Sequence, residues 1–433
     1  MYNFKYVAAL SVAALLAPLS VSANSNIEEV IITSSLIDAT SDEISNPLHV
    51  INGDSIATDA SQSIGASIDS LVGISTSDYG AAVGQPIIRG MSGSRVKVLN
   101  NGVVIRDVSG LGPDHVNDVD LNNIQQIEIV RGPSSLLYSN GTIGGIVNVV
   151  DNTIARKDFT ESKFKLGLEA QSVNDGDSHD ISYQNNIGGL NISAAYKDSQ
   201  FGDFDIPDGA VVHHDEEHEG EEHADEEHAE EHEGEEHEED LGYLPNSDIA
   251  STSKRVGISK TGDWGYFGLS VSDIDNLYGI PFHGEGHEGH EDEHGDEEVH
   301  EEGHEEGHED EEGHEDEHEG ERIFSTTESN IINLEGSFVV GNSWLSKIDY
   351  HFRDSDYSLT EQHVEEEGHE EEGEEHEGEE HEGEHHEEGP TTFSNEAREY
   401  GAIFDLANDS VSQKISVNFV VEDISVIGEE AFI

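Results

Sequence analysis

The stretch that decides the fold runs from Pro86 to Val150 and reads PIIRGMSGSRVKVLNNGVVIRDVSGLGPDHVNDVDLNNIQQIEIVRGPSSLLYSNGTIGGIVNVV. Two apolar runs, Val96 to Leu99 and Val103 to Ile105, flank Asn100-Asn101-Gly102. Asn-Gly between apolar runs is a strong hairpin signal, because a type I′ turn needs positive φ at both central residues. The sequence therefore predicts a tight β-hairpin here.

Two more apolar runs follow the hairpin. Ile127 to Val130 is ended by Arg131-Gly132-Pro133, where Pro lacks a backbone donor and Gly permits a sharp turn. Gly144-Gly145 then leads into Ile146 to Val150. Together these patterns predict a compact unit rich in β-strands.

Several separate blocks of this stretch occur in a characteristic order. They are Ile88-Arg89-Gly90, Arg95-Val96, Asn101-Gly102-Val103, Ile129 to Tyr138, and Gly144 to Asn148. In order and spacing they resemble the plug domain of TonB-dependent outer-membrane receptors, over about Glu28 to Ala155. One departure is Ser139, where many members have Gly after the Tyr. A small soluble β-domain would explain the hairpin but not this run of blocks.

The charge of the chain is concentrated in a few segments. The 433 residues carry a formal charge of -77, and 54 of the 96 acidic residues lie in 215–240, 285–321 and 361–388, which contain no Lys or Arg. The remainder is an ordinary, mildly acidic protein with no basic cluster, so we expect no nucleic-acid partner. The absence of Cys excludes thiolate metal sites, disulfides and a lipoprotein anchor.

The N-terminus predicts secretion followed by a coupling segment. Residues 1–23 have a charged start, a short apolar run and the small-residue ending Val21-Ser22-Ala23, which is typical of a signal peptide. Residues 24–40 form the next segment. Within it, Glu29, Val30, Ile31, Ile32 and Thr33 resemble the family's TonB box. The resemblance implies that the TonB energy-coupling protein binds it by strand addition. A disordered tail is the alternative.

The residues after the unit of 41–155 change to long alternating patterns. Apolar and polar side chains alternate over Phe164 to Gln171, Leu190 to Tyr196, Trp344 to Arg353, Tyr400 to Leu406 and Ile415 to Val421. A transmembrane β-barrel has this period, and so does a soluble β-sandwich. The preceding plug favours the barrel. We therefore expect a mainly β protein: an N-terminal α+β plug domain followed by a transmembrane antiparallel β-barrel over 156–433.

This expected barrel is incomplete. Outside the acidic segments, 156–433 has room for about eight to ten strands of roughly 10 residues, whereas plugged receptors close with about 22. The sequence thus suggests a chain truncated at its C-terminus. The resemblance implies contact with outer-membrane lipid and a location in the outer membrane of a Gram-negative bacterium.

Three long loops rich in His and Glu interrupt the strands, at 213–240, 283–321 and 361–390, and hold 22 of the 26 histidines. We expect them to be disordered, because they lack apolar residues to bury. Imidazole together with carboxylate suits zinc first, then nickel, copper or cobalt. The candidate ligands are His213, His214, His218, His283, His287, His290, His294, His304 and His308. A purely solvated charge run is the alternative.

The second loop contains H-E-x-x-H four times, the pattern of zinc proteases. A segment built of His, Glu and Gly generates it by chance, and no apolar stripe is present to bury a helix. We therefore expect no enzymatic activity and no catalytic cofactor.

The most specific metal-site candidate is Asp114-His115, in Gly112-Pro113-Asp114-His115-Val116. This segment resembles the plug apex of the zinc-transporting subgroup, whose adjacent Asp and His ligate metal on the external side. Two ligands do not complete a tetrahedral zinc site, so barrel residues are expected to supply the rest. An apex loop with an incidental His is the alternative.

The resulting functional hypothesis is a TonB-dependent receptor that imports zinc or a similar divalent metal as its transported ligand. Within this class, a receptor for a metal chelate, siderophore or haem is the alternative. A surface metal buffer without transport is the rival from another class.

Overall fold

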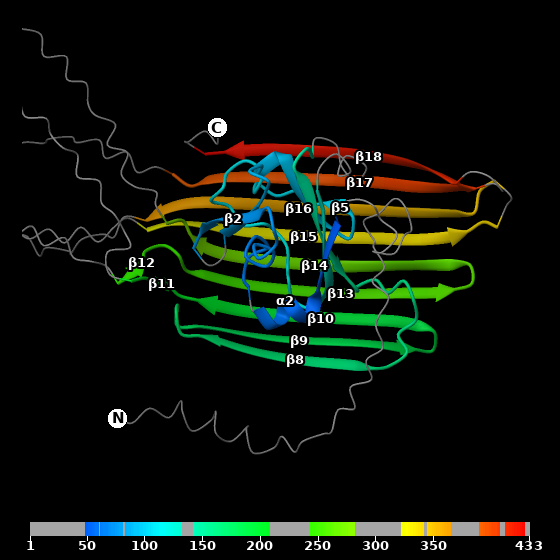
Figure 1. The fold of residues 1–433 in the computed structure, drawn as a ribbon, viewed down its shortest axis with the longest axis horizontal. Coiled ribbons are helices and arrows are strands. Elements are labelled where there is room, and N and C mark those ends of the chain that lie inside the picture. Colours follow the sequence, from blue (N-terminus) through cyan, green and yellow to red (C-terminus); the bar gives the residue numbers. More distant parts are fainter. Residues whose placement is uncertain are drawn as a thin grey trace, which may run out of the picture.

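The computed structural model describes residues 48–59, 61–80, 83–131, 142–207, 242–281, 322–341, 344–364, 389–407 and 412–428. The signal-peptide segment, the TonB-box residues Glu29 to Thr33 and the nine loop histidines named above lie outside the described residues. In the described part of the chain, two large β-sheets carry the fold (Figure 1). No helix there has the length and apolar character needed to cross a bilayer.

The N-terminal unit is an α+β domain around a five-stranded sheet of order β1-β6-β7-β4-β5. β4 pairs with β7 in parallel, and the other pairs are antiparallel. The elements of this unit are β1 (Leu48–Asn52), α2 (Gly53–Asp59), β2 (Ile74–Tyr79), β3 (Val83–Ile88), a 3-10 turn η1 (Gly93–Arg95), β4 (Val96–Asn100), β5 (Val103–Val104), β6 (Ile124–Arg131) and β7 (Gly145–Asp151).

The predicted hairpin and the two following strands are confirmed. Asn101 and Gly102 have φ of 52° and 85°, as a type I′ turn between β4 and β5 requires. The Asn148 side-chain oxygen on β7 accepts a hydrogen bond of 2.8 Å from the Gly102 amide and fixes the turn to the sheet. Ile127, Val147 and their neighbours on β6 and β7 form the fully buried core of the domain.

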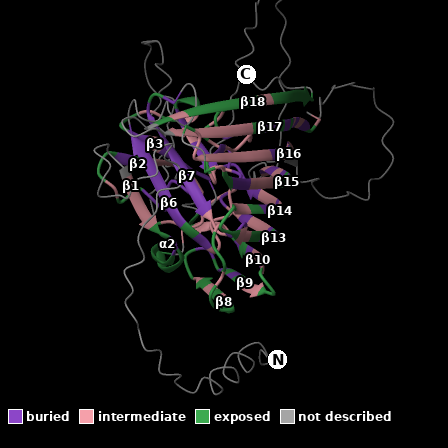
Figure 2. Ribbon diagram, turned by 90° about the vertical axis from the view of Figure 1, so that its right-hand side faces the viewer, coloured by how far each residue is buried: buried purple, intermediate pink, exposed green. Residues whose placement is uncertain are grey.

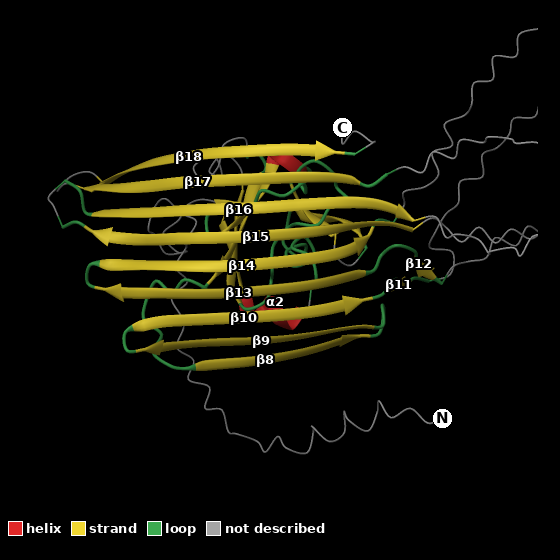
Figure 3. Cartoon of the chain, turned by 180° about the vertical axis from the view of Figure 1, so that it is seen from behind, coloured by secondary structure: helices red, strands yellow, loops and turns green. Residues whose placement is uncertain are grey.

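The second unit is one nine-stranded sheet of order β18-β17-β16-β15-β14-β13-β10-β9-β8, in which every neighbouring pair is antiparallel (Figure 3). The sheet does not close, because β8 and β18 are its two edges. Its strands are β8 (Lys163–Gln171), β9 (Gly176–Ile187), β10 (Leu190–Phe201), β13 (Ile249–Gly262), β14 (Gly265–Gly279), β15 (Arg322–Val339), β16 (Lys347–Val364), β17 (Thr391–Ala407) and β18 (Ser412–Ile427). A short ribbon, β11 (Phe204–Asp205) with β12 (Tyr243–Leu244), stands between β10 and β13.

The five alternating patterns predicted from the sequence fall on β8, β10, β16, β17 and β18, although Trp344 precedes β16. Their apolar side chains face outward on the edge strands: Phe164, Leu166 and Leu168 of β8 are 64–75% exposed. An outward apolar row is what a lipid-facing strand requires. The open sheet agrees with the incomplete barrel that the sequence predicts.

The strands that precede the histidine-rich segments all finish at the same end of the sheet, here called the loop end. In an antiparallel meander, β10, β14 and β16 all finish at the same end. Segments 208–241, 282–321 and 365–388 each follow one of these strands or the adjoining ribbon. The opposite end carries short turns such as Gly188-Gly189 between β9 and β10.

The α+β domain packs against one face of the nine-stranded sheet (Figure 2). Arg255 on β13 anchors it: its guanidinium lies 3.1 Å from the Asp120 carboxylate and 3.4 Å from the Asp151 carboxylate, and all three side chains are buried. Arg353 on β16 donates to the Asn100 and Val103 carbonyl oxygens of the hairpin. Buried charges and main-chain acceptors, rather than apolar contacts, thus hold the middle of this interface.

Replacing Arg255 with Ala should loosen the domain from the sheet, since two buried carboxylates lose their counter-charge. Removing one partner of a buried ion pair lowers the free energy of unfolding by about 3–5 kcal/mol. Lys254 is the matched control, because it precedes Arg255, is exposed and pairs with Asp273. Lys254→Ala should change that free energy by less than about 1 kcal/mol. Denaturant unfolding in detergent compares the variants, and equal losses would contradict this account of the interface.

Candidate functional site

The apex loop, residues 105–118, is closed on itself by the carboxylate of Asp107. Its Oδ1 accepts hydrogen bonds from the Ser109 amide (3.2 Å) and hydroxyl (2.6 Å), and its Oδ2 accepts from the Asp118 amide (2.9 Å). Asn117 donates to the Ser109 hydroxyl at 2.7 Å. These bonds join the two ends of the loop, so that Gly110 to His115 project as a defined tip.

An apolar cluster seats this tip at the loop end of the sheet. Val108 and Val116 from the loop pack with wall residues that begin or end strands, including Tyr278, Ile323 and Phe393. Tyr278 is fully buried in this cluster. The predicted site residues therefore lie at the end of the sheet from which all three histidine-rich segments depart.

His115 is held from both sides. Its side chain is buried, and its Nδ1 lies 3.3 Å from the Tyr278 hydroxyl on β14. Gln85 on β3 donates to the carbonyl oxygens of Gly112 (2.6 Å) and His115 (3.1 Å), which fixes the backbone beneath the ring. When Nδ1 donates its proton to the Tyr278 oxygen, Nε2 keeps the lone pair that a metal needs.

Asp114 and His115 converge on the same point above Gly112. A Cβ atom built on Gly112 would lie 2.5 Å from Asp114 Oδ1 and 3.4 Å from His115 Nε2. The absence of a side chain at Gly112 therefore leaves the space between a carboxylate oxygen and an imidazole nitrogen. Asp114 is partly exposed, so the pair is open to the loop end.

The described residues supply two ligands here and not a complete set. Among them, no group of three or more His, Asp or Glu side chains is placed to hold a metal ion. On the wall, the Glu361 carboxylate of β16 acts electrostatically on the Tyr278 hydroxyl, and so does Asp114. The structure brings together Asp114 and His115 only, since the remaining predicted ligands fall outside the described ranges.

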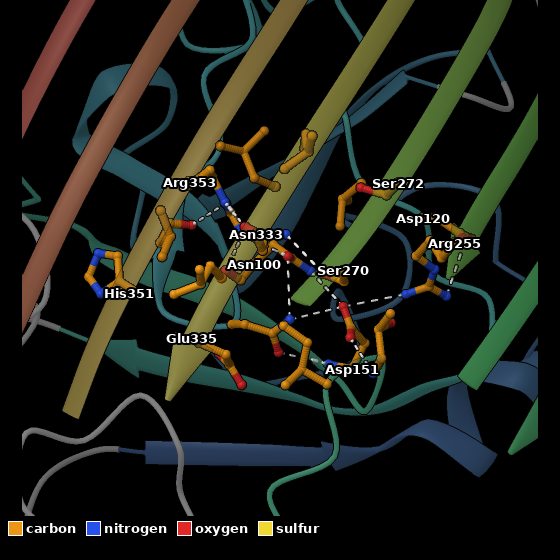
Figure 4. Close-up of a pocket in the computed structure, with 18 of the residues that line it drawn as sticks. Asn100, Asp120, Asp151, Arg255, Ser270, Ser272, Asn333, Glu335, His351 and Arg353 are labelled. Carbon is orange, nitrogen blue, oxygen red and sulfur yellow. Dashed lines mark hydrogen bonds and ion pairs between the residues drawn. The ribbon is translucent and has the colours of Figure 1, made fainter. Parts of the chain in front are cut away.

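Below the apex loop, a cavity with several charged side chains in its lining lies between the α+β domain and the sheet (Figure 4). About 50 Å³ of it is open to the centres of water molecules, and one water needs about 10–15 Å³ by this measure, so a few waters fit. Its lining includes Asp118, Asp120 and Asp151 on one side and Arg255 and Arg353 on the other. The two arginines point toward this cavity from the wall.

Two residues of the apex loop line this cavity, Ile105 and Asp118, and Asp118 is the ionisable one. It is 4% exposed, and its Oδ1 has no hydrogen-bond partner. Burial raises the pKa of Asp118 to about 7, and the nearby Asp107 carboxylate adds to the rise. Sequence reasoning missed Asp118, Gln85 and Tyr278, because no motif marks them and Tyr278 meets His115 from 163 positions away.

The comparisons with known proteins agree with this architecture. Residues 40–146 match the family model described as the TonB-dependent receptor plug domain. These residues form a TonB-dependent receptor plug domain. The match covers the apex loop and the five-stranded sheet up to the start of β7.

Solved structures resemble the plug and the nine-stranded sheet together. The FrpB iron transporter from Neisseria meningitidis is 11% identical, with a TM-score of 0.56, and the alignment covers 87% of this chain and 49% of that chain. The copper transporter OprC is 12% identical, with a TM-score of 0.54 and coverage of 88% and 46%. The alcaligin outer membrane receptor FauA from Bordetella pertussis is 13% identical, with a TM-score of 0.52 and coverage of 92% and 51%.

At identities this low, the similarity shows a shared fold. The chain spans about half the length of these structures. FauA is an outer membrane receptor, which agrees with the location expected from the sequence.

The raised pKa of Asp118 makes a prediction about pH. A carboxyl group with a folded pKa of about 7, against 3.8 ordinarily, binds its proton more tightly when folded. Its contribution to stability is therefore full below the ordinary pKa and falls as the pH rises toward about 7. Asp118→Asn, which cannot ionise, should remove this fall.

The measurement is the free energy of plug unfolding at about pH 5 and about pH 8, for wild type and Asp118→Asn. We expect the wild type to lose more stability than the variant on going to the higher pH. Because every other titrating group is present in both proteins, equal losses would show that Asp118 is not a buried, protonated acid.

Proposed function

We propose that the protein is a TonB-dependent outer-membrane receptor that imports zinc or a similar divalent metal ion. The observation that carries the proposal is the convergence of Asp114 Oδ1 and His115 Nε2 above Gly112, at the loop end of the sheet. Carboxylate and imidazole are the ligand types that zinc takes in proteins without thiolates. The protein is a transporter in this proposal, and not an enzyme.

The histidine-rich loops fit this proposal by their place in the chain. All three leave the sheet at the end where Asp114 and His115 lie. Each offers many weak His and carboxylate combinations, including those with His213, His287 and His304. An ion released from one ligand set meets another nearby, so the loops raise the local metal concentration above the apex.

The transport step follows from the buried interface. A metal bound at the apex is separated from the opposite end by the plug and its polar contacts with the sheet. We propose that TonB engages Glu29 to Thr33 as an added strand and pulls the plug away from the wall. Arg255 and Arg353 make contacts that such a movement must break.

A receptor for a metal chelate or haem remains the second candidate, because the similar structures include an iron transporter and the alcaligin receptor. The apex favours a bare ion. Organic chelates bury 70–90% or more of their surface in mostly apolar pockets, whereas Asp114 and His115 offer two metal-ligating atoms. A surface buffer without transport would need no coupling segment, so deletion of 28–34 separates it: import stops while binding to the loops persists.

Replacing both Asp114 and His115 with Ala should lower metal uptake at limiting metal, because two ligands are lost. Gly112→Ala should do the same without removing a ligand, since its methyl group enters the space between the two. Leu111→Ala is the matched control, because Leu111 lies on the same tip and is 71% exposed. Uptake of radioactive zinc by cells measures the effect. Wild-type uptake by the double variant would exclude the apex site.

Deleting the three histidine-rich loops should slow uptake when metal is scarce and leave it nearly unchanged when metal is plentiful. Capture requires neutral imidazoles, so it should also weaken as the pH falls through the histidine range near about 6.5. A concentration series of metal uptake, repeated at pH values on both sides of the histidine range, tests both points. An equal loss at every concentration would mean that the loops build the pathway itself, and no loss anywhere would mean that they are only a solvated acidic fringe.

A further inference from the structure

Asp118 stands between the apex loop and the cavity below it. The neighbouring Asp107 has both carboxylate oxygens engaged in closing the loop. Asp118, by contrast, has Oδ1 without a partner although the side chain is 96% removed from solvent. A buried carboxylate oxygen without a partner carries a desolvation penalty, which a bound cation or proton offsets.

The arginines of the cavity are occupied elsewhere. Arg255 is paired with Asp120 and Asp151. Arg353 donates to Asn333 Oδ1 at 2.6 Å and to Asn100 Oδ1 at 3.0 Å. Neither makes an ion pair with Asp118 among the described residues. Arg353 acts on Asp118 only electrostatically, so Asp118 Oδ1 stays without a hydrogen-bond partner.

Two hydroxyl groups of the wall lie near this carboxyl group. The Ser329 hydroxyl of β15 is its contact on the wall, and Tyr357 of β16 lies within electrostatic reach of both Asp118 and Asp107. Ser329 pairs directly with Tyr357 in the sheet register, so both hydroxyls belong to one patch of the wall. The cavity that Asp118 lines also presents Ser270 and Ser272 and has room for a few waters. Oxygen ligands and waters together suit a divalent cation that keeps part of its hydration shell.

We propose that Asp118 is the ligand of a second, inner cation site, which receives the metal ion after it leaves Asp114 and His115. The proposal rests on the import function proposed above. The two sites lie on one loop, three residues apart in sequence, with Asp118 facing inward to the cavity. The apex pair selects the ion, and Asp118 then binds it on the inner side of the apolar cluster at the loop end.

The closed apex loop carries both sites. Asp107 accepts a hydrogen bond of 2.9 Å from the Asp118 amide and so fixes the backbone of Asp118 at the base of the loop that holds Asp114 and His115. Release to the opposite side then needs a movement of this loop.

The test is anomalous X-ray diffraction at the zinc edge from crystals of the intact protein soaked in zinc chloride. We expect two peaks, one between Asp114 and His115 and one beside Asp118 at a zinc–oxygen distance of about 2.0–2.2 Å. Asp118→Asn, which keeps the shape of the side chain, should lose the inner peak and keep the apex peak. His115→Ala should lose or weaken the apex peak and keep the inner one.

The matched control is Asp263→Asn, because Asp263 is exposed in the turn between β13 and β14 at the opposite end of the sheet. It should keep both peaks. A wild-type apex peak without an inner peak would overturn the inner site and leave the proposed function standing. An inner peak that survives in Asp118→Asn would overturn the assignment of Asp118. No peak at either place would overturn both proposals, and the refined plug in the same crystals shows whether each variant is folded.

Discussion

The interface between the plug and the sheet is buried and polar, and the rest of the structure depends on it. Arg255 reaches from β13 to two plug carboxylates, and Arg106 reaches from the plug to Glu399 on β17 at 2.9 Å. Charges buried in this way are stable only while their partners stay in place. Between them, the wall presents small hydroxyl side chains such as Ser253 and Ser259. When the plug moves away, water can hydrate such a polar surface. The free-energy cost of exposing it is lower than that of exposing an apolar interface.

The interface between plug and sheet has two parts that differ in polarity. At the loop end, an apolar cluster around Tyr278 and Val116 seats the apex and orients His115. Below it, the interface turns polar and contains the cavity lined by Asp118. In the proposed import path, an ion that passes the apolar cluster would enter surroundings of carboxylates, hydroxyls and water.

Much of the fold could be predicted, because its strongest signals are local. Asn101-Gly102 demands positive φ wherever it lies, and the structure shows it. The outward apolar row of β8 alternates clearly because lipid-facing and inward positions differ in polarity. β15 was missed for the opposite reason: its buried positions include Ser325, Thr327 and Ser329, so the face turned to the plug is as polar as a solvated one.

The site could be predicted only in part. The adjacent Asp114 and His115 are visible in the sequence, but their convergence above Gly112 is a property of the folded loop. The Tyr278 contact joins the apex loop to β14, between residues 163 positions apart. Asp118 gains its character from burial against β15, which no local pattern encodes. Local sequence patterns predict neither contacts between distant residues nor the burial of a single side chain.

The central claim is that the protein imports a divalent metal ion and not an organic iron compound. The most direct measurement compares uptake of radioactive zinc, a ferric chelate and haem in cells that depend on this protein for each, with and without the proton-motive force. The account predicts energy-dependent accumulation of zinc alone. Accumulation of the chelate or of haem without zinc would contradict it.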